Sequence, residues 1–314
     1  MKNFTSLKDV DKLEKLIQSG LSLKEHPLEH FSLGKGKTLG LIFFNASLRT
    51  RLSTQKAAQN LGMQTLVMNF DNDGWKLEFE DGATMNGNTQ EHIKDAVQVL
   101  GQYCDIIGIR SFAGLKNLKE DYQEKMLSHF INESKVPIVS LESAIRHPLQ
   151  SLADLMTINE FKENEKPKVV LSWAPHPKAL PQAVANSFAE WALGAGFDLT
   201  ITHPKGLELS KEFTTGATIE YDQEKALENA DFVYVKNWSA FDNYGAIIQD
   251  DNWTMTEEKM KLTNNASFMH CLPIRRNVVA TDEVIENEKS LVLEQANNRT
   301  YAAQAVLKTI LENE

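Results

Sequence analysis

The chain has 314 residues, of which 42% are hydrophobic, so it is long enough for two domains with well-filled cores. Its formal net charge of −10 at pH 7 argues against a nucleic-acid partner, because a phosphate polymer would be repelled except at a local basic patch. The sequence has no run of eighteen apolar residues and no secretory signal, so we expect a cytoplasmic protein that does not contact a membrane. The two cysteines, Cys104 and Cys271, match no zinc spacing.

The first half of the chain alternates predicted helices and strands. The predicted strands are 37–44, 65–70, 105–110 and 136–142. The predicted helices are 5–20, about 50–61, 93–103 and 152–161. The first helix is expected to end at Gly20, a residue type that often terminates helices. The polar segment 71–91 has no regular pattern, and its length favours a functional role.

A second alternating set follows a solvated connection at 164–167. The predicted strands are 168–173, 198–202, 232–236 and 267–270. The predicted helices are 182–195, 223–229, 257–262 and, by its apolar pattern, 302–312. Two such sets predict an α/β fold with two doubly wound parallel-sheet domains. We expect the domains to be 1–149 and 150–291, with the C-terminal helical segment 292–314 returning to the first domain.

A turn rich in arginine and hydroxyl groups, Ser47-Leu48-Arg49-Thr50-Arg51, joins the first strand to the helix after it. Unpaired N–H groups and the positive end of the helix dipole favour an anion at such a position. The turn therefore predicts a phosphate site, although an ordinary capped helix with a solvated arginine pair explains it as well. No GxxxxGK[ST] motif is present that would indicate a nucleoside triphosphate.

Other polar residues follow the predicted strands, at the edge where doubly wound sheets bind ligands. They are Arg110, Glu142, His147, His176, Lys236 and Cys271. Guanidinium groups such as those of Arg49 and Arg110 suit phosphate oxygens, whereas His147 and Gln150 can donate to a carbonyl oxygen, so the set suits an acyl phosphate. Singly, each residue has an ordinary alternative: Arg110 could pair with an acid, and His147 could shape the turn before Pro148.

Several motifs together resemble the ornithine transcarbamylase family over nearly the whole chain. They are Ser47-Leu48-Arg49-Thr50-Arg51, Ile109-Arg110, His147-Pro148-Leu149-Gln150, His270-Cys271-Leu272-Pro273 and Asn298-Arg299. The resemblance implies the transcarbamylase fold, with a carbamoyl phosphate-binding domain at 1–149 and an acceptor-binding domain at 150–291. It also implies transfer of a carbamoyl group to a primary amine without metal or organic cofactor. The eight histidines show no HExxH or HxH spacing, which argues against a metal-dependent hydrolase.

The same resemblance implies residue roles. The residues expected to bind carbamoyl phosphate are Ser47, Leu48, Arg49, Thr50, Trp75, Arg110, His147, Gln150, Cys271, Leu272 and Arg299. The expected catalytic residues among them are Arg110, His147, Gln150 and Cys271. Trp75 would reach the carbamoyl phosphate of a neighbouring subunit in a homotrimer with shared active sites, although it could also be a half-buried loop anchor.

The acceptor is predicted from Lys236. Ordinary ornithine transcarbamylases carry an aspartate and a Ser-Met-Gly segment near this position, whereas residues 235–240 here read Val-Lys-Asn-Trp-Ser-Ala. A lysine would repel a free α-ammonium and attract a carboxylate, so the α-nitrogen of the acceptor should be blocked. The chain thus resembles the N-acylornithine branch of the family, although Lys236 could also be a surface charge. The residues expected to contact an acylornithine are Glu142, His176, Lys236, Arg275 and Gln90.

Two acyl groups, acetyl and succinyl, are known in this branch. Acetyl-specific members carry glutamate and succinyl-specific members carry proline at the position of Gln90, which matches neither. A neutral amide does not repel the free carboxylate of a succinyl group, and the overall likeness favours succinyl, in a reaction of arginine biosynthesis. The alternatives are the same reaction on N-acetylornithine and a catalytically idle carbamoyl phosphate-binding regulatory protein.

Overall fold

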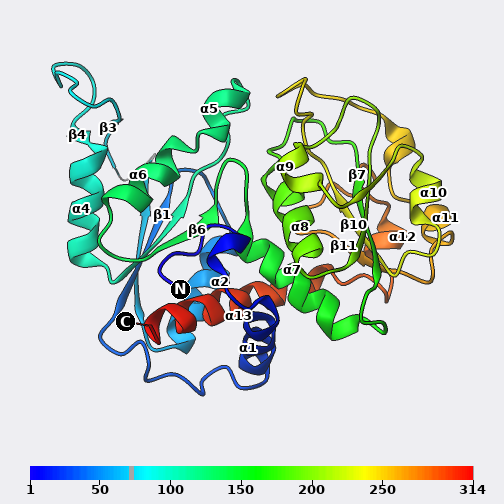
Figure 1. Cartoon of the computed structure of the whole chain (residues 1–314), viewed down its shortest axis with the longest axis horizontal. Helices are drawn as coiled ribbons and strands as arrows, with labels where there is room; N and C mark the ends of the chain where they lie inside the picture. The colour runs from blue at the N-terminus through cyan, green and yellow to red at the C-terminus, as the bar shows by residue number, and fades with distance from the viewer. Residues whose placement is uncertain (71–73, 314) are drawn as a thin grey trace.

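The computed structural model of the protein describes residues 1–70 and 74–313 and shows two lobes, each built around a parallel sheet (Figure 1). The first sheet has the strand order β2 (Gln64–Asn69), β1 (Thr38–Phe43), β5 (Ile106–Arg110) and β6 (Ile138–Glu142). The second has the order β11 (Ser267–Met269), β10 (Phe232–Lys236), β7 (Lys168–Trp173), β8 (Asp198–Thr202) and β9 (Thr218–Glu220). The predicted α/β fold with two doubly wound parallel sheets is therefore confirmed.

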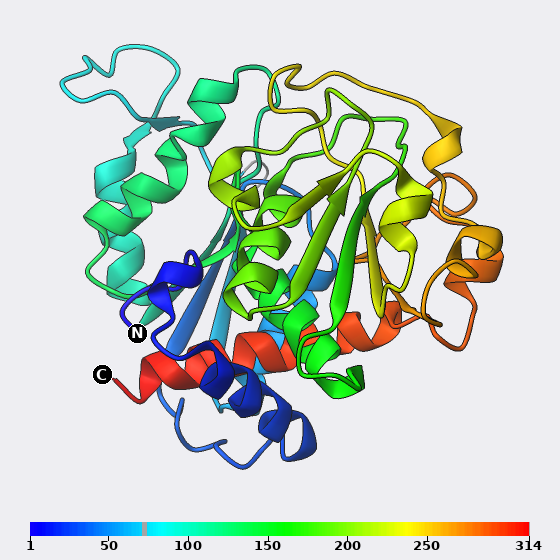
Figure 2. The ribbon, with the colours of Figure 1, turned by 45° about the vertical axis from the view of Figure 1, so that its right-hand side comes forward.

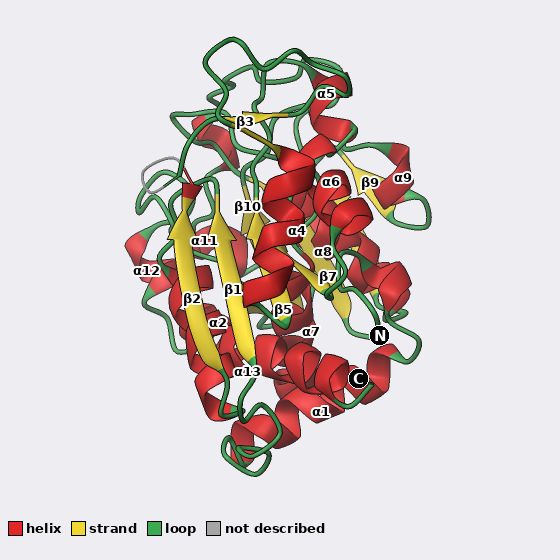
Figure 3. Cartoon of the chain, turned by 90° about the vertical axis from the view of Figure 1, so that its left-hand side faces the viewer, coloured by secondary structure: helices red, strands yellow, loops and turns green. Residues whose placement is uncertain are grey.

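Helices cover both faces of the first sheet (Figure 3). One face packs against α4 (Ile93–Tyr103) and α6 (Lys125–Glu133). The other packs against α2 (Arg49–Asn60), α7 (Pro148–Phe161) and α13 (Val292–Leu311), with α1 (Leu13–Glu25) behind them. Because both faces are covered, every residue of β5 is buried and the strand reads as a continuous apolar run that ends in Arg110.

The second sheet is covered in the same way. Its first face packs against α8 (Ala183–Gly194), which contacts both α7 and the short α9 (Lys211–Thr214). Its second face packs against α10 (Gln223–Leu227), α11 (Glu257–Met260) and α12 (Asp282–Ile285). Alternate residues of β7 divide between the two cores: Val169 and Leu171 lie in one, and Val170 lies in the other.

Helix α13 ties the lobes together. It contacts α1, α2 and α7, and Figure 2 shows it in red running along one end of the molecule below both groups of strands. The largest hydrophobic core extends from the first sheet through α7 and α13 to the second sheet, so the two lobes share buried apolar surface. Although α13 has 20 residues, no helix in the described part of the chain is long and apolar enough to cross a membrane.

The structure corrects several predicted boundaries. Gly20 lies inside α1, and a Cβ atom there would be 2.6 Å from Sδ of Met156, so this glycine permits close packing of α1 on α7 and does not end the helix. Helix α13 begins at Val292, ten residues before the apolar pattern that predicted it.

Some short elements were not predicted at all. They are β3 (Leu77–Glu78), β4 (Glu91–His92), α5 (Leu118–Tyr122), α6, α9, β9, α12 and the 3-10 helix η2 (Asp251–Trp253). Strand β3 lies within the segment 71–91 that was expected to be irregular, and it pairs with β4, which begins at the last residue of that segment. The first three residues of the segment lie outside the described residues.

Candidate active site

The candidate site lies where the switch points of the two sheets face each other. In the first sheet the strand order reverses between β1 and β5, and in the second it reverses between β7 and β10. Doubly wound sheets bind ligands at such points, beyond the carboxyl ends of the strands. The cleft there has a volume of about 410 Å³. Its lining is Ala46, Ser47, Leu48, Arg49, Thr50, Arg110, Phe112, Glu142, His147, Gln150, His176, Leu180, Pro181, Val184, Lys236, Cys271, Leu272, Pro273, Ile274, Arg275 and Arg299.

The first end of the cleft is the N-terminus of α2. Leu48 occupies the N-cap position, and its aliphatic side chain cannot accept a hydrogen bond from the N–H groups of the first turn. These donors therefore remain available to an anion. Arg299, from α13, reaches the same turn: its Nη2 donates to Oγ1 of Thr50 at 2.5 Å. The guanidinium of Arg49 lines the cleft beside them. This end can therefore bind a phosphate group through backbone and guanidinium donors.

Arg110 and Glu142 form a buried ion pair at the ends of β5 and β6. Nη2 of Arg110 lies 3.0 Å from Oε2 of Glu142, and Nε lies 3.3 Å from the same oxygen. Nη1 of Arg110 donates to the backbone oxygens of Asn45 and Ala46, which fixes the turn before α2. Burial raises the pKa of Glu142, and Arg110 opposes that rise.

His147 lies beside this pair, with Nε2 3.5 Å from Oε2 of Glu142. Burial, followed by the positive charges of Arg299, Arg110 and Lys236, holds the pKa of His147 well below its ordinary value. The imidazole is therefore neutral at physiological pH. A neutral imidazole has one N–H donor, and that donor can hydrogen-bond to a carbonyl oxygen in the cleft.

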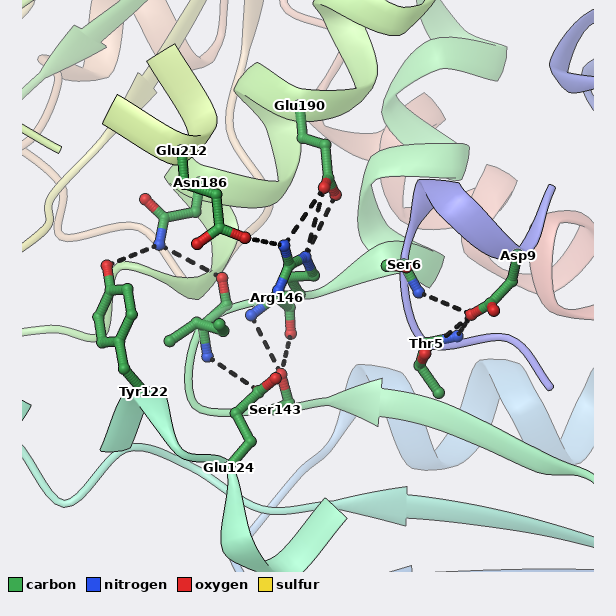
Figure 4. A network of polar contacts seen from close by, with 11 residues as sticks. Thr5, Ser6, Asp9, Tyr122, Glu124, Ser143, Arg146, Asn186, Glu190 and Glu212 are labelled. Carbon is green, nitrogen blue, oxygen red and sulfur yellow. Dashed lines mark hydrogen bonds and ion pairs between the residues drawn. The ribbon is translucent and has the colours of Figure 1, made fainter. Parts of the chain in front are cut away.

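The position of His147 is fixed by its neighbours in the chain. Pro148 occupies the first turn of α7, where its restricted φ favours the helix and its missing N–H costs nothing. Arg146 extends to the second lobe, where Nη2 lies 2.6 Å from Oε1 of Glu212 and Nε lies 3.4 Å from Oε2 of Glu190 (Figure 4). The backbone N–H of Ser143 donates to the carbonyl oxygen of Arg146 at 2.8 Å, which closes a tight turn. The loop that carries His147 is thus held from both lobes.

Gln150 and Arg299 meet one helical turn beyond His147. Nη1 of Arg299 donates to Oε1 of Gln150, and both side chains are buried. This contact places a residue from α7 next to a residue from α13 although 149 positions separate them in the sequence.

The other end of the cleft comes from the second sheet. Lys236 ends β10 and is buried, and in the described part of the chain its ammonium group has no ion-pair partner. Arg275 lines the same end and likewise has no ion pair with any residue that the structure describes. His176 follows β7, and burial lowers the pKa of its imidazole. Two unpaired cations therefore face this end, which suits carboxylates.

Cys271 and Leu272 lie between the two ends. Burial raises the pKa of the Cys271 thiol, so the group is an uncharged thiol and not a thiolate nucleophile. Leu272 has a φ of +54°, and its N–H donates to Nδ1 of His270 at 2.9 Å. The backbone after β11 is thereby turned so that both residues face the cleft.

The structure brings all the predicted site residues into this one cleft except Trp75 and Gln90. Trp75 is 56% exposed, and its Nε1 donates to Oε2 of Glu91 at 2.8 Å. Gln90 is exposed, and its backbone N–H donates to the Lys76 carbonyl at 3.0 Å. Neither side chain lines the cleft of its own chain, so the expected contact between Gln90 and an acylornithine is not made within one chain. Arg51, the second arginine of the predicted phosphate turn, does not line the cleft either.

Sequence reasoning missed the apolar wall of the cleft. It is formed by Phe112, Leu180, Pro181, Val184 and Ile274. The ring of Phe112 lies 4.1 Å from Cζ of Arg110, a cation–π contact that a local pattern does not indicate. The Ala-Leu-Pro segment before α8 was a signal that could have found Leu180 and Pro181, because it too follows a strand end.

A second cavity of about 380 Å³ lies beside α11 and α12, where the chain enters β11. Its lining includes Glu257, Lys261 and Phe268, but no arginine, histidine or cysteine. Lys261 is already paired with Glu257 at 3.3 Å. None of the residues that the sequence predicts for the site lines this cavity, so we assign the site to the cleft.

The likeness to known families agrees with this geometry. The carbamoyl-P binding domain of aspartate/ornithine carbamoyltransferase matches residues 2–160, and the Asp/Orn binding domain of the same family matches residues 181–310. The chain belongs to the aspartate/ornithine carbamoyltransferase family. The first match contains all four strands of the first sheet, and the second match contains every strand of the second sheet except β7.

Individual carbamoyltransferases of this family resemble the chain over its full length. It is 52% identical to the N-succinylornithine carbamoyltransferase of Bacteroides fragilis (strain 638R), over 100% of this chain and 99% of the relative. It is 36% identical to the N-acetylornithine carbamoyltransferase of Xylella fastidiosa (strain 9a5c), over 93% and 94%. A crystal structure of a mutant N-acetyl-L-ornithine transcarbamylase complexed with carbamyl phosphate and N-succinyl-L-norvaline has a TM-score of 0.93 and 34% identity, covering 99% of this chain and 100% of that one. The transcarbamylase fold is confirmed.

Proposed function

We propose that this carbamoyltransferase transfers the carbamoyl group of carbamoyl phosphate to the side-chain amine of N-succinylornithine, giving N-succinylcitrulline and phosphate in arginine biosynthesis. The observation that carries the choice of acceptor is the pair of unpaired cations, Lys236 and Arg275, at the second-sheet end of the cleft. N-succinylornithine has two carboxylates and N-acetylornithine has one, so the succinyl compound matches two cations better. The 52% identity to a relative named N-succinylornithine carbamoyltransferase supports the same choice.

The phosphate group of carbamoyl phosphate binds at the N-terminus of α2. Its oxygens accept from the backbone of 47–50 and from the guanidinium groups of Arg49, Arg110 and Arg299. These donors bind the phosphate as a substrate and then stabilise the charge that grows on it as it departs.

The carbamoyl carbonyl accepts from neutral His147, and Gln150 holds the carbamoyl group from the other side. The acceptor amine attacks the carbonyl carbon, and the C–O bond to phosphate breaks as the tetrahedral adduct collapses. The amine loses one proton, which leaves with the phosphate. Positioning and oxyanion stabilisation carry the reaction, and Cys271 and the backbone of Leu272 line the reacting centre without attacking it.

The acylornithine lies toward the second sheet. Lys236 and Arg275 bind its carboxylates, and Glu142 and His176 bind its polar backbone groups. The apolar wall, including Leu180 and Val184, packs against its methylene groups. In this arrangement domain 1–149 supplies most contacts to carbamoyl phosphate and domain 150–291 supplies most contacts to the acceptor. Gln150 and Glu142 are exceptions, and α13 returns Arg299 to the first domain.

The enzyme works as a cytoplasmic homotrimer with shared active sites. Support comes from three exposed leucines of the first lobe: Leu48 at the N-cap of α2, Leu52 on α2 and Leu66 on the edge strand β2 are 66%, 57% and 52% exposed. Burial of these side chains against a second copy removes apolar surface from water. Trp75 and Gln90, which do not line the cleft of their own chain, then reach the cleft of the neighbouring subunit.

A product assay tests the proposal. Ornithine, N-acetylornithine and N-succinylornithine are each incubated with carbamoyl phosphate and the enzyme, and the citrulline-type product is measured. We expect the highest kcat/KM with N-succinylornithine and little product from ornithine. A preference for N-acetylornithine would overturn the choice of acyl group. Binding of carbamoyl phosphate without product from any acceptor would instead indicate a regulatory protein.

A further inference from the structure

A buried carboxylate that the mechanism does not use lies beneath the candidate site. Asp154 is on α7, one turn after Gln150, and its side chain is fully buried. It does not line the cleft. A carboxylate at such a position is costly unless it is hydrogen-bonded, so its partners indicate what it does.

The partners of Asp154 are two amide side chains, and both donate to the same oxygen. Nε2 of Gln150 lies 2.7 Å from Oδ1, and Nε2 of Gln295, on α13, lies 2.9 Å from it. An amide has its donor and its acceptor on opposite sides. Once each nitrogen is bound to Asp154, each amide oxygen must face the other way.

These two oxygens bind the groups that form the cleft. Oε1 of Gln150 accepts from Nη1 of Arg299, and Nη2 of the same guanidinium donates to Oγ1 of Thr50 at the phosphate end. Oε1 of Gln295 accepts from the backbone N–H of His270 at 2.8 Å, one residue before Cys271. One carboxylate therefore lies at the centre of two short chains of hydrogen bonds, each of which ends at a part of the site.

We infer that Asp154 is a positioning residue, which through Gln150 orients Arg299 toward the phosphate and through Gln295 holds the backbone that presents Cys271 and Leu272. If the Gln150 amide turned over, its NH₂ group would face the guanidinium of Arg299, and two donors would oppose each other. The Gln295 amide would likewise oppose the His270 N–H. Asp154 excludes both arrangements.

The surroundings of Asp154 agree with this role. Burial raises the pKa of Asp154 to about 7, against the opposing effects of Gln295, Gln150, Tyr234 and Arg299. When the carboxyl group takes up a proton, the proton binds Oδ2, because Oδ1 already accepts from the two amides. Oδ1 is therefore an acceptor in both the charged and the neutral form. The role of Asp154 therefore depends on Oδ1 as an acceptor and not on the charge of the carboxyl group.

Substitution of Asp154 tests the inference, which rests on the proposed contacts of Gln150 and Arg299 with carbamoyl phosphate. Asp154→Asn keeps a carbonyl oxygen that can accept from both amides, whereas Asp154→Ala removes the acceptor. We expect Asp154→Ala to raise the KM for carbamoyl phosphate by about tenfold or more, and Asp154→Asn to leave it within about threefold of the wild type. An unchanged KM in the alanine variant, or equal losses in both variants, would overturn the inference.

A second variant keeps the test decisive if the alanine variant does not fold. Gln295→Met has a similar size but cannot join Asp154 to His270, so it should lower kcat by about fivefold or more while the KM for carbamoyl phosphate stays within about threefold. A kcat within twofold of the wild type would contradict the inference. Thr157→Val is the matched control, because Oγ1 of Thr157 accepts from Asn298 at 3.0 Å between the same two helices without reaching the cleft.

The activity of the wild-type enzyme distinguishes a failure of this inference from a failure of the proposed function. If the wild-type enzyme forms no product from any acylornithine, the proposed function fails before any variant is compared. If the wild type turns over and Thr157→Val keeps its kinetic constants, the Asp154 and Gln295 variants alone decide the inference.

Discussion

Arg110 and Glu142 form an ion pair in the wall of the cleft, with 3.0 Å between Nη2 and Oε2, and each side chain is about 10% exposed or less. Because the guanidinium would remain buried without its partner, Glu142→Ala should lower the free energy of unfolding by about 3 kcal/mol. Urea denaturation of Glu142→Ala, Arg110→Ala and the double variant measures the coupling between the two residues. Losses that simply add would show that the pair does not act as a unit.

Arg49→Ala should reduce kcat/KM for carbamoyl phosphate by about 100-fold, because it removes charge-assisted donors from the phosphate end. Lys56→Ala is the control, since Lys56 is a cation exposed on the same helix. Steady-state kinetics with saturating acceptor measure both. Near-normal activity in Arg49→Ala would reject the phosphate site at the N-terminus of α2.

Lys236→Ala should raise the KM for N-succinylornithine between about tenfold and 100-fold, because a buried cation that binds a carboxylate is lost. The KM for carbamoyl phosphate should stay within about threefold. Lys225→Ala, which removes a surface lysine paired with Asp222 at 3.6 Å, should change neither constant. Equal losses for both substrates would argue against an acceptor-binding role for Lys236.

Mixing two inactive variants tests the shared active sites. Trp75→Ala removes the residue that reaches the neighbouring cleft, and Arg49→Ala removes the residue that acts in its own cleft. If the subunits of a trimer exchange at random, about a quarter of the sites in an equal mixture contain both native residues. We expect activity to return in the mixture after subunit exchange. Activity that stays at the level of the separate variants would contradict sites shared in this way.

The pH dependence of stability should report on Asp154. Its pKa is raised from 3.8 to about 7 in the folded protein, so between these values the folded state holds a proton that the unfolded chain releases. The stability that this group contributes is therefore present at low pH and is lost as pH rises toward 7, by at most about 1.4 kcal/mol per pH unit. Urea unfolding from pH 5 to 8 compares the wild type with Asp154→Asn. The free energy of unfolding of the wild type, relative to that of the variant, should fall up to about pH 7 and then remain constant. A difference independent of pH would refute the raised pKa.

Much of the fold could be predicted because buried parallel strands read as apolar runs. The strand 232–236 was predicted with the bounds that the structure shows, and so was 168–173. Helix ends were harder to predict when polar residues on a helix face the interior. The apolar pattern located only 302–312 of α13, because Gln295, Asn298 and Arg299 are buried polar residues that hide the apolar period of its first half.

The part of the candidate site that could be predicted is the part that follows from the order of the strands. Residues that follow strand ends, such as Arg110 and Lys236, could be found because topology alone brings strand ends together. Asp154 could not be found in this way, since Gln295 is 141 positions away in the sequence. The signal that the sequence did carry was a lone carboxylate within the apolar run Leu152–Ile158.

Helix α13 is the last element to be synthesised, and this determines when the active site becomes complete. The strands that form both sheets are synthesised before Val292, but Arg299 reaches Thr50 and Gln150 only from α13. A nascent chain can therefore bury much of its first sheet while the phosphate end still lacks one of its guanidinium groups. Catalytic competence should appear late on the ribosome, as a step separate from the collapse of the first lobe.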